Sequence, residues 1–131
     1  MITLPPNVVD IITNAEGKAL ATYVPDCLHV VPVSTVKVKD DKILLVNYFM
    51  GQTLSNLQAN PQVSLACWRG LSGYQIKGEV AYVTSGEVFD EIKNWVAEIL
   101  PDRVVNGVLI ITPKAVYDVS ATIEKPGQKI L

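Results

Sequence analysis

The chain has 131 residues, a length that suits one domain, and 49% of them are apolar while 18% are charged. This balance is typical of a well-packed globular protein and excludes an intrinsically disordered chain. The formal charge is −2 and the lysines are scattered, so the sequence lacks the basic patch that nucleic-acid binding requires.

The first part of the sequence predicts a short helix followed by strands. Pro5 and Pro6 suit a first helical turn, and an apolar stripe follows them. Residues 18–24 predict a strand that is closed by Pro25 and Asp26, and residues 28–38 predict a longer strand because they are rich in β-branched residues. Within the longer strand, Pro32 cannot donate to a ladder, and it therefore indicates an edge, a bulge or a gap that faces a ligand.

Residues 42–50 are predicted to return as a strand after a turn at Asp40 and Asp41. This strand carries apolar residues on both faces, which is typical of a strand that is buried on both sides or packed against a partner. We interpret its end, residues 48–50, as partly dimer interface, since a lone surface strand would be less apolar.

The middle of the chain predicts a second helix and two more strands. The helix covers residues 52–60, with Thr53 as a possible N-cap and Pro61 just after the end. Strands are predicted over residues 62–68 and 74–84.

The last third contains the clearest helical pattern. Residues 84–87, Thr-Ser-Gly-Glu, match a capping box, and the helix ends before Pro101. A final strand pair between residues 108 and 120 is predicted to break at Pro113, and we expect the polar tail from Thr122 to be loose.

Many strands, three helices and mostly short connections predict a mainly β (α+β) fold. An antiparallel barrel fits this pattern better than a helix bundle or a doubly wound sheet. The sequence shows no repeat or linker, so residues 1–131 are predicted to form a single domain.

Three features of the sequence concern its compartment. The start lacks a basic and apolar leader, and no apolar run approaches the roughly 18 residues of a membrane span. Cys27 and Cys67 are far apart and form no CxxC pair. We therefore expect a cytoplasmic protein with free thiols, without a signal peptide and without a membrane partner.

The sequence offers little catalytic apparatus of its own. His29 is the only histidine, so no second histidine can join it as a ligand, and we expect no metal site. Two interpretations of His29 stay open: a structural or exposed strand residue, or a contact to substrate or cofactor. Neither a G-x-S-x-G elbow nor a Gly-rich nucleotide loop is present, so a cofactor must supply most of any chemistry.

Four segments occur in a characteristic order. They are Ala21-Thr22 with residues 31–35 (VPVST), residues 40–46 (DDKILLV), residues 51–57 (GQTLSNL) with 60–65 (NPQVSL), and residues 74–79 (YQIKGE). In this order and spacing, the set resembles the flavin-binding split barrels of the pyridoxamine phosphate oxidase-like family. The resemblance covers about residues 20–100. It implies an antiparallel six-stranded split β-barrel with short peripheral helices, forming a homodimer with flavin mononucleotide (FMN) at the protomer interface.

The resemblance also implies where the cofactor lies. Two strands flank the flavin, and the helix near Thr53 directs its N-terminus at the phosphate, as a helix start with free N–H groups can. The alternative is that Thr53 is only a cap. The cofactor-binding residues implied are Val31, Pro32, Val33, Ser34, Thr35, Val46, Asn47, Gly51, Gln52, Thr53, Gln75 and Lys77.

Several of these residues have structural alternatives. The family often has a lysine or arginine where this chain has Gln52, and an amide binds phosphate less strongly than a cation does. Lys77 is a candidate to replace that charge, or it is a solvated strand lysine. Asn47 is either a flavin contact or a residue at a bulge or strand-end cap. Gln75 is either a flavin contact or a buried polar residue that hydrogen-bonds to the backbone.

The two tryptophans, Trp68 and Trp95, are interpreted as core or dimer contacts, with stacking near the flavin ring as the alternative.

Three functions are compatible with the sequence. The first is an FMN-dependent oxidoreductase or electron carrier that receives electrons from a small molecule or a redox protein. The second is a non-catalytic module that binds or senses flavin. The third is a split barrel with another cofactor, a deazaflavin or haem. A true pyridoxamine phosphate oxidase is not expected, because the basic substrate site and the C-terminal segment of that enzyme are missing. The sequence identifies no catalytic residue.

Overall fold

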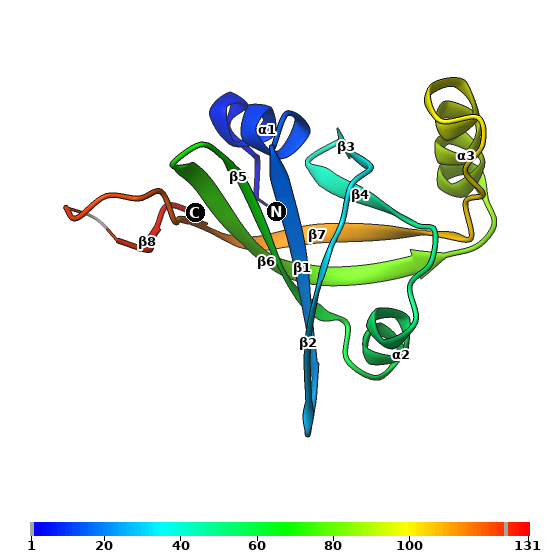
Figure 1. The fold of residues 1–131 in the computed structure, drawn as a ribbon, viewed down its shortest axis with the longest axis horizontal. Coiled ribbons are helices and arrows are strands. Elements are labelled where there is room, and N and C mark those ends of the chain that lie inside the picture. The colour runs from blue at the N-terminus through cyan, green and yellow to red at the C-terminus, as the bar shows by residue number, and fades with distance from the viewer. Residues whose placement is uncertain (1, 125) are drawn as a thin grey trace.

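The computed structural model describes residues 2–124 and 126–131, and it consists of one antiparallel sheet with three helices around it (Figure 1). The elements are α1 (Pro6–Thr13), β1 (Gly17–Val24), β2 (Cys27–Pro32), β3 (Val36–Lys39), β4 (Lys42–Asn47), α2 (Gln52–Ala59), β5 (Gln62–Arg69), β6 (Ser72–Val83), α3 (Glu87–Ile99), β7 (Gly107–Asp118) and β8 (Gln128–Lys129). The strand order is β2-β1-β5-β6-β7-β4-β3, with β8 beside β7. The mainly β fold class and the antiparallel split barrel are therefore confirmed.

The strand predicted over residues 28–38 is divided into two strands, β2 and β3. They lie at opposite edges of the sheet, and this division allows the sheet to form a barrel. The chain leaves β2 at Pro32, which has no N–H for the ladder, and the N–H of Val33 makes a last bond to the oxygen of Lys18 at 3.0 Å. It then crosses to pair β3 with β4 at the other edge of the sheet (Figure 1). Residues 33–35 thus join the two edges of the sheet. The division into β2 and β3, together with the additional strand β8, raises the number of strands above the six expected.

The C-terminal part also differs from the prediction. The final strand pair is one continuous strand, β7, which passes through Pro113 because β6 shifts register between Lys77 and Gly78. Gly78 is required there, since a Cβ would lie 2.4 Å from the backbone oxygen of Thr112. Within the tail expected to be loose, residues 128–129 form β8, which pairs with β7.

Helices α2 and α3 both have a glycine at the N-cap. The N-cap of α3 is Gly86, with φ of 101°, so the capping box at residues 84–87 was a wrong prediction. The residue at this N-cap adopts a positive φ, a conformation that favours glycine. The N-cap therefore falls on Gly86 and not on Thr84, as the capping pattern would require. The N-cap of α2 is Gly51, and Thr53 lies two residues inside the helix rather than at its cap.

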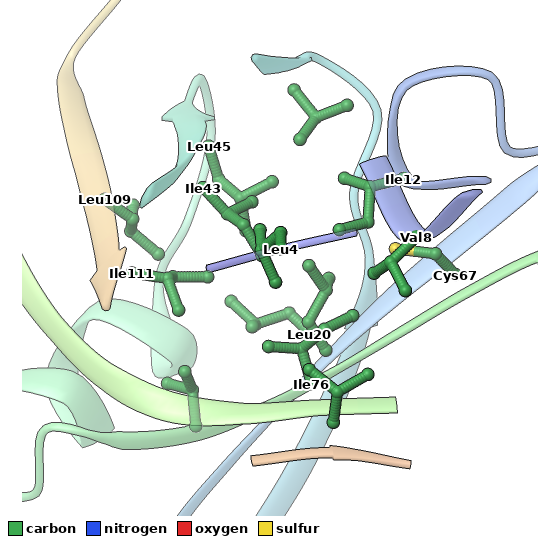
Figure 2. Close-up of a cluster of buried hydrophobic side chains, with 14 of the residues drawn as sticks. Leu4, Val8, Ile12, Leu20, Ile43, Leu45, Cys67, Ile76, Leu109 and Ile111 are labelled. Carbon is green, nitrogen blue, oxygen red and sulfur yellow. The ribbon is translucent and has the colours of Figure 1, made fainter. Parts of the chain in front are cut away.

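The core lies inside the barrel, and Figure 2 shows its centre. Val8 and Ile12 of α1 belong to the same buried cluster as apolar side chains of the strands, including Leu20 and Ile76. A second cluster lies under α3 and comprises Leu44, Val46, Tyr48, Ile92, Val96, Val105 and Val108. Strand β4 contributes alternate residues to the two clusters, so its prediction as a strand buried on both sides is confirmed.

Candidate functional site

A cavity of about 390 Å³ opens where β4 leads into α2. This volume lies in the range of roughly 300–1,000 Å³ that small-molecule sites occupy. Its lining comprises His29, Val31, Pro32, Val33, Ser34, Val46, Tyr48, Phe49, Met50, Gly51, Thr53 and Arg103. We call it the α2 cavity. Seven of the residues expected to bind the cofactor line it: Val31, Pro32, Val33, Ser34, Val46, Gly51 and Thr53.

The start of α2 presents unused hydrogen-bonding groups to this cavity. Gly51 has no side chain to cap the first N–H groups of the helix, which lack intrahelical acceptors. Thr53 is only 1% exposed, yet its hydroxyl forms no hydrogen bond with any group in residues 2–124 and 126–131. Every fully buried polar side-chain atom of those residues has a hydrogen-bond partner, so the Thr53 hydroxyl, which has none, is not fully buried. Thr53 lines the α2 cavity, and this cavity is the space open to its hydroxyl.

Asn47 and Thr35 do not line the cavity, but each forms a hydrogen bond with a residue that does. Asn47 is buried, donates to the hydroxyl of Tyr82 at 2.8 Å and accepts from the N–H of Met50 at 2.7 Å. It therefore holds the turn between β4 and α2, as its strand-end interpretation proposed. Thr35 forms a 2.7 Å hydrogen bond with the hydroxyl of Tyr48 and fixes that ring in the cavity wall.

Gln52 is directed along α2 instead of into the cavity. Its Nε2 donates to Oδ1 of Asn56 at 2.8 Å. Asn56 is itself buried and donates to the Thr22 hydroxyl at 3.0 Å. Gln52 thus completes a hydrogen-bond chain that attaches α2 to β1.

Gln75 and Lys77 lie on another face of the molecule. Gln75 donates to the Ser64 hydroxyl at 2.9 Å, and Nζ of Lys77 lies 4.9 Å from the centroid of the Tyr117 ring. Lys77 lines a second cavity of about 410 Å³, together with Ala21, Thr22, Tyr23, Leu28, Gln62, Val63, Ser64, Gly78, Glu79 and Lys114.

The strand registers show why one chain does not unite these two sets of residues. Lys77 is opposite Ser64, Ser64 is opposite Ala21, and Ala21 is opposite Val30, so all four lie on the same face of the sheet. The α2 cavity is lined by His29 and Val31, the neighbours of Val30 along β2, whose side chains point to the other face.

Neither the tryptophans nor the cysteines line the α2 cavity. Trp95 packs in the cluster under α3, and Trp68 lies on the exposed sheet face. Both thiols are free, and burial raises the pKa of Cys67 to about 12. Because the thiolate is the nucleophilic form, Cys67 is unsuited to covalent catalysis.

Sequence reasoning missed Arg103 and the position of the Tyr48 ring. The Arg103 Cζ lies 5.1 Å from the centroid of that ring, and both residues line the cavity. They are 55 residues apart, and only the return of the chain after α3 brings them together. No local pattern signals such a contact.

Among the described residues, we found no cluster of three or more His, Cys, Asp or Glu side chains suited to a metal ion. Over the same residues, no helix combines the length and hydrophobicity of a membrane span.

The fold places the chain among the split β-barrel proteins, with an apolar cavity at the first turn of α2. A family model described as pyridoxamine 5'-phosphate oxidase matches residues 4–120. The chain belongs to this family, and the resemblance stated from its motifs is confirmed. A search of curated proteins found no match.

Solved structures share the fold at low sequence identity. HupZ from Group A Streptococcus has a TM-score of 0.83 and 21% identity, covering 100% of both chains. An FMN-binding protein from Syntrophomonas wolfei subsp. wolfei has a TM-score of 0.77 and 18% identity, over 88% of this chain and 85% of that one. A structure identified as F420 reductase has a TM-score of 0.66 and 14% identity, over 86% and 98%. At such identities the likeness concerns the fold.

Proposed function

We propose that this chain is an FMN-binding flavoprotein that acts as an oxidoreductase or electron carrier. The observation that carries the proposal is Thr53, a buried residue whose hydroxyl has no protein partner among the described residues and faces an apolar cavity beside the uncapped N-terminus of α2. An apolar space suits a flavin ring, and a hydroxyl with free N–H groups at a helix start suits a phosphate. The residues present therefore fit FMN.

Each part of the cavity has a role in this proposal. Val31, Val33 and Val46 provide apolar contact for the ring and exclude water. Gly51 and Thr53 hold the phosphate by hydrogen bonds that are strengthened by its charge. Bound FMN would supply reversible transfer of electrons and protons, so the protein itself needs no nucleophile or metal for this chemistry.

We propose that FMN lies between the two protomers of a homodimer. Support comes from Phe49, which lines the cavity although it is 89% exposed, and from Leu28 and Val30, which are 81% and 64% exposed on β2. Large apolar side chains are unfavourable in contact with water, and a second copy of the chain would bury them in a dimer interface. A two-fold axis would also let Gln75 and Lys77 of one protomer approach the α2 cavity of its partner, which they do not reach within one chain.

The test is direct ligand binding by the full chain. We expect FMN to bind with a lower dissociation constant than riboflavin, since riboflavin lacks the phosphate. Equilibrium dialysis with both ligands measures this difference. Absence of FMN binding at saturating ligand would refute the proposal. Stopped-flow reduction of the bound flavin by NADH or NADPH then separates an oxidoreductase from a storage or sensing module.

A second cofactor is favoured by one observation. His29, the only histidine, lines the α2 cavity, and imidazole is a ligand of haem iron. Haem in place of FMN would give an intense Soret band that shifts in His29→Ala, whereas bound FMN gives flavin absorption that persists in this variant. We further propose a cytoplasmic location and an electron donor that is either a small molecule or a redox protein.

A further inference from the structure

We propose that Arg103 is the cation that binds the anionic group at the start of α2. This inference rests on the proposed function, in which that group is the phosphate of FMN. It assigns to a residue after α3 the charge that Gln52 does not provide.

The loop that carries Arg103 is fixed to the segment leading into α2. The N–H of Arg103 donates to the oxygen of Leu100 at 3.0 Å and closes the turn after α3. Asn106 then donates from its backbone to the Asn47 oxygen at 2.9 Å and from its side chain to the Tyr48 oxygen at 2.6 Å. Arg103 is therefore held between two attachments, and its position is set by the same turn that shapes the cavity.

The Arg103 side chain lies against the Tyr48 ring, with 5.1 Å between Cζ and the ring centroid. Tyr48 is buried, and its hydroxyl is fixed by Thr35. A cation–π contact uses none of the N–H donors of a guanidinium, and neither ion pair among the described residues involves Arg103. Its fork of donors therefore stays available for the oxygens of a phosphate.

The charge of Arg103 is also uncompensated. The chain has two arginines; Arg69 pairs with Asp10 at 2.9 Å, and the other ion pair among the described residues joins Lys39 and Glu91. Among residues 2–124 and 126–131, Arg103 is the only lysine or arginine that lines the α2 cavity. A phosphate there would meet one cation, the Thr53 hydroxyl and the first N–H groups of α2.

The test compares FMN and riboflavin binding in variants of Arg103. Arg103→Gln keeps a planar group for the ring but removes the charge, and we expect it to raise the FMN dissociation constant about tenfold. Riboflavin binding should change less than twofold. Arg103→Lys should retain part of the preference for FMN, and added salt should reduce that preference. Arg69→Ala, which removes the paired arginine, is the matched control and should leave both affinities unchanged.

Equal losses for FMN and riboflavin in Arg103→Gln would overturn the inference, since they would mean that Arg103 only supports the Tyr48 ring. Unchanged binding of both ligands would overturn it as well.

Inorganic phosphate separates this inference from the proposed function. In NMR titrations at constant ionic strength, phosphate should shift the Arg103 Nε resonance and the Thr53 amide of the flavin-free chain, while chloride should not. If the wild-type chain binds no flavin but shows these shifts, the FMN proposal fails and the anion site stands. If phosphate causes no shift at Arg103, the anion site is refuted whatever the flavin result.

Discussion

Replacing Thr53 by valine should weaken FMN binding while leaving the fold and riboflavin binding nearly unchanged. Valine keeps the branched shape of this buried side chain, so its packing is retained. The hydroxyl has no hydrogen-bond partner among the described residues, so its removal leaves no protein group unpaired. What is lost is one hydrogen bond to a charged phosphate, worth about 1.5–3 kcal/mol, which corresponds to a roughly 10- to 150-fold higher dissociation constant.

Calorimetric titrations of both ligands, combined with thermal denaturation of the free chain, measure this effect. Thr22→Val is the matched control, because the Thr22 hydroxyl is buried and accepts a hydrogen bond from Asn56 at 3.0 Å. That variant should lose about 1–3 kcal/mol of stability but keep the ratio of FMN to riboflavin affinity. If Thr53→Val weakened both ligands equally, or neither, the phosphate would not lie at the first turn of α2.

The other predictions concern association and thiol reactivity. Leu28→Asp should convert the proposed dimer to a monomer and weaken FMN binding, whereas Val88→Asp on α3 should leave the chain dimeric. Sedimentation equilibrium measures both variants, and a dimeric Leu28→Asp chain would contradict the proposed interface. In the folded chain at pH 8, Cys27 should react with a thiol reagent and Cys67 should not, because burial raises the pKa of Cys67 to about 12 and leaves only roughly one molecule in 10⁴ as thiolate. Two reacting thiols without denaturant would refute the burial of Cys67.

Local patterns predicted much of the fold. The two-sided apolar pattern of β4 led to its burial between two clusters, and Pro61 marked the end of α2 correctly. The capping box at residues 84–87 failed because helix α3 starts on Gly86 in a positive-φ conformation, which a motif of residue types does not reveal. Pro32 signalled an irregularity, but only strand pairing shows that the chain crosses there to the other sheet edge.

The candidate site was predicted where it is local and missed where it is not. Residues 31–34 and Gly51 were assigned through the order of motifs within the sequence, and they line the cavity. Arg103 reaches it through a loop whose Asn106 bonds to Tyr48, 58 residues earlier. Gln75 and Lys77 were assigned to the same site, yet alternation along the strands puts them on the opposite sheet face.

The segment at residues 33–35 has a consequence for how the barrel responds to its ligand. It is the covalent link between the two free edges of the sheet, β2 and β3, and its Val33 and Ser34 also form part of the cavity wall. A molecule bound there contacts β2 and this segment as well as Val46 of β4, the strand that pairs with β3, and so adds a non-covalent connection between the two sides of the sheet. Amide hydrogen exchange in β3, the short edge strand, should therefore slow on ligand binding and report occupancy without any optical signal from the ligand.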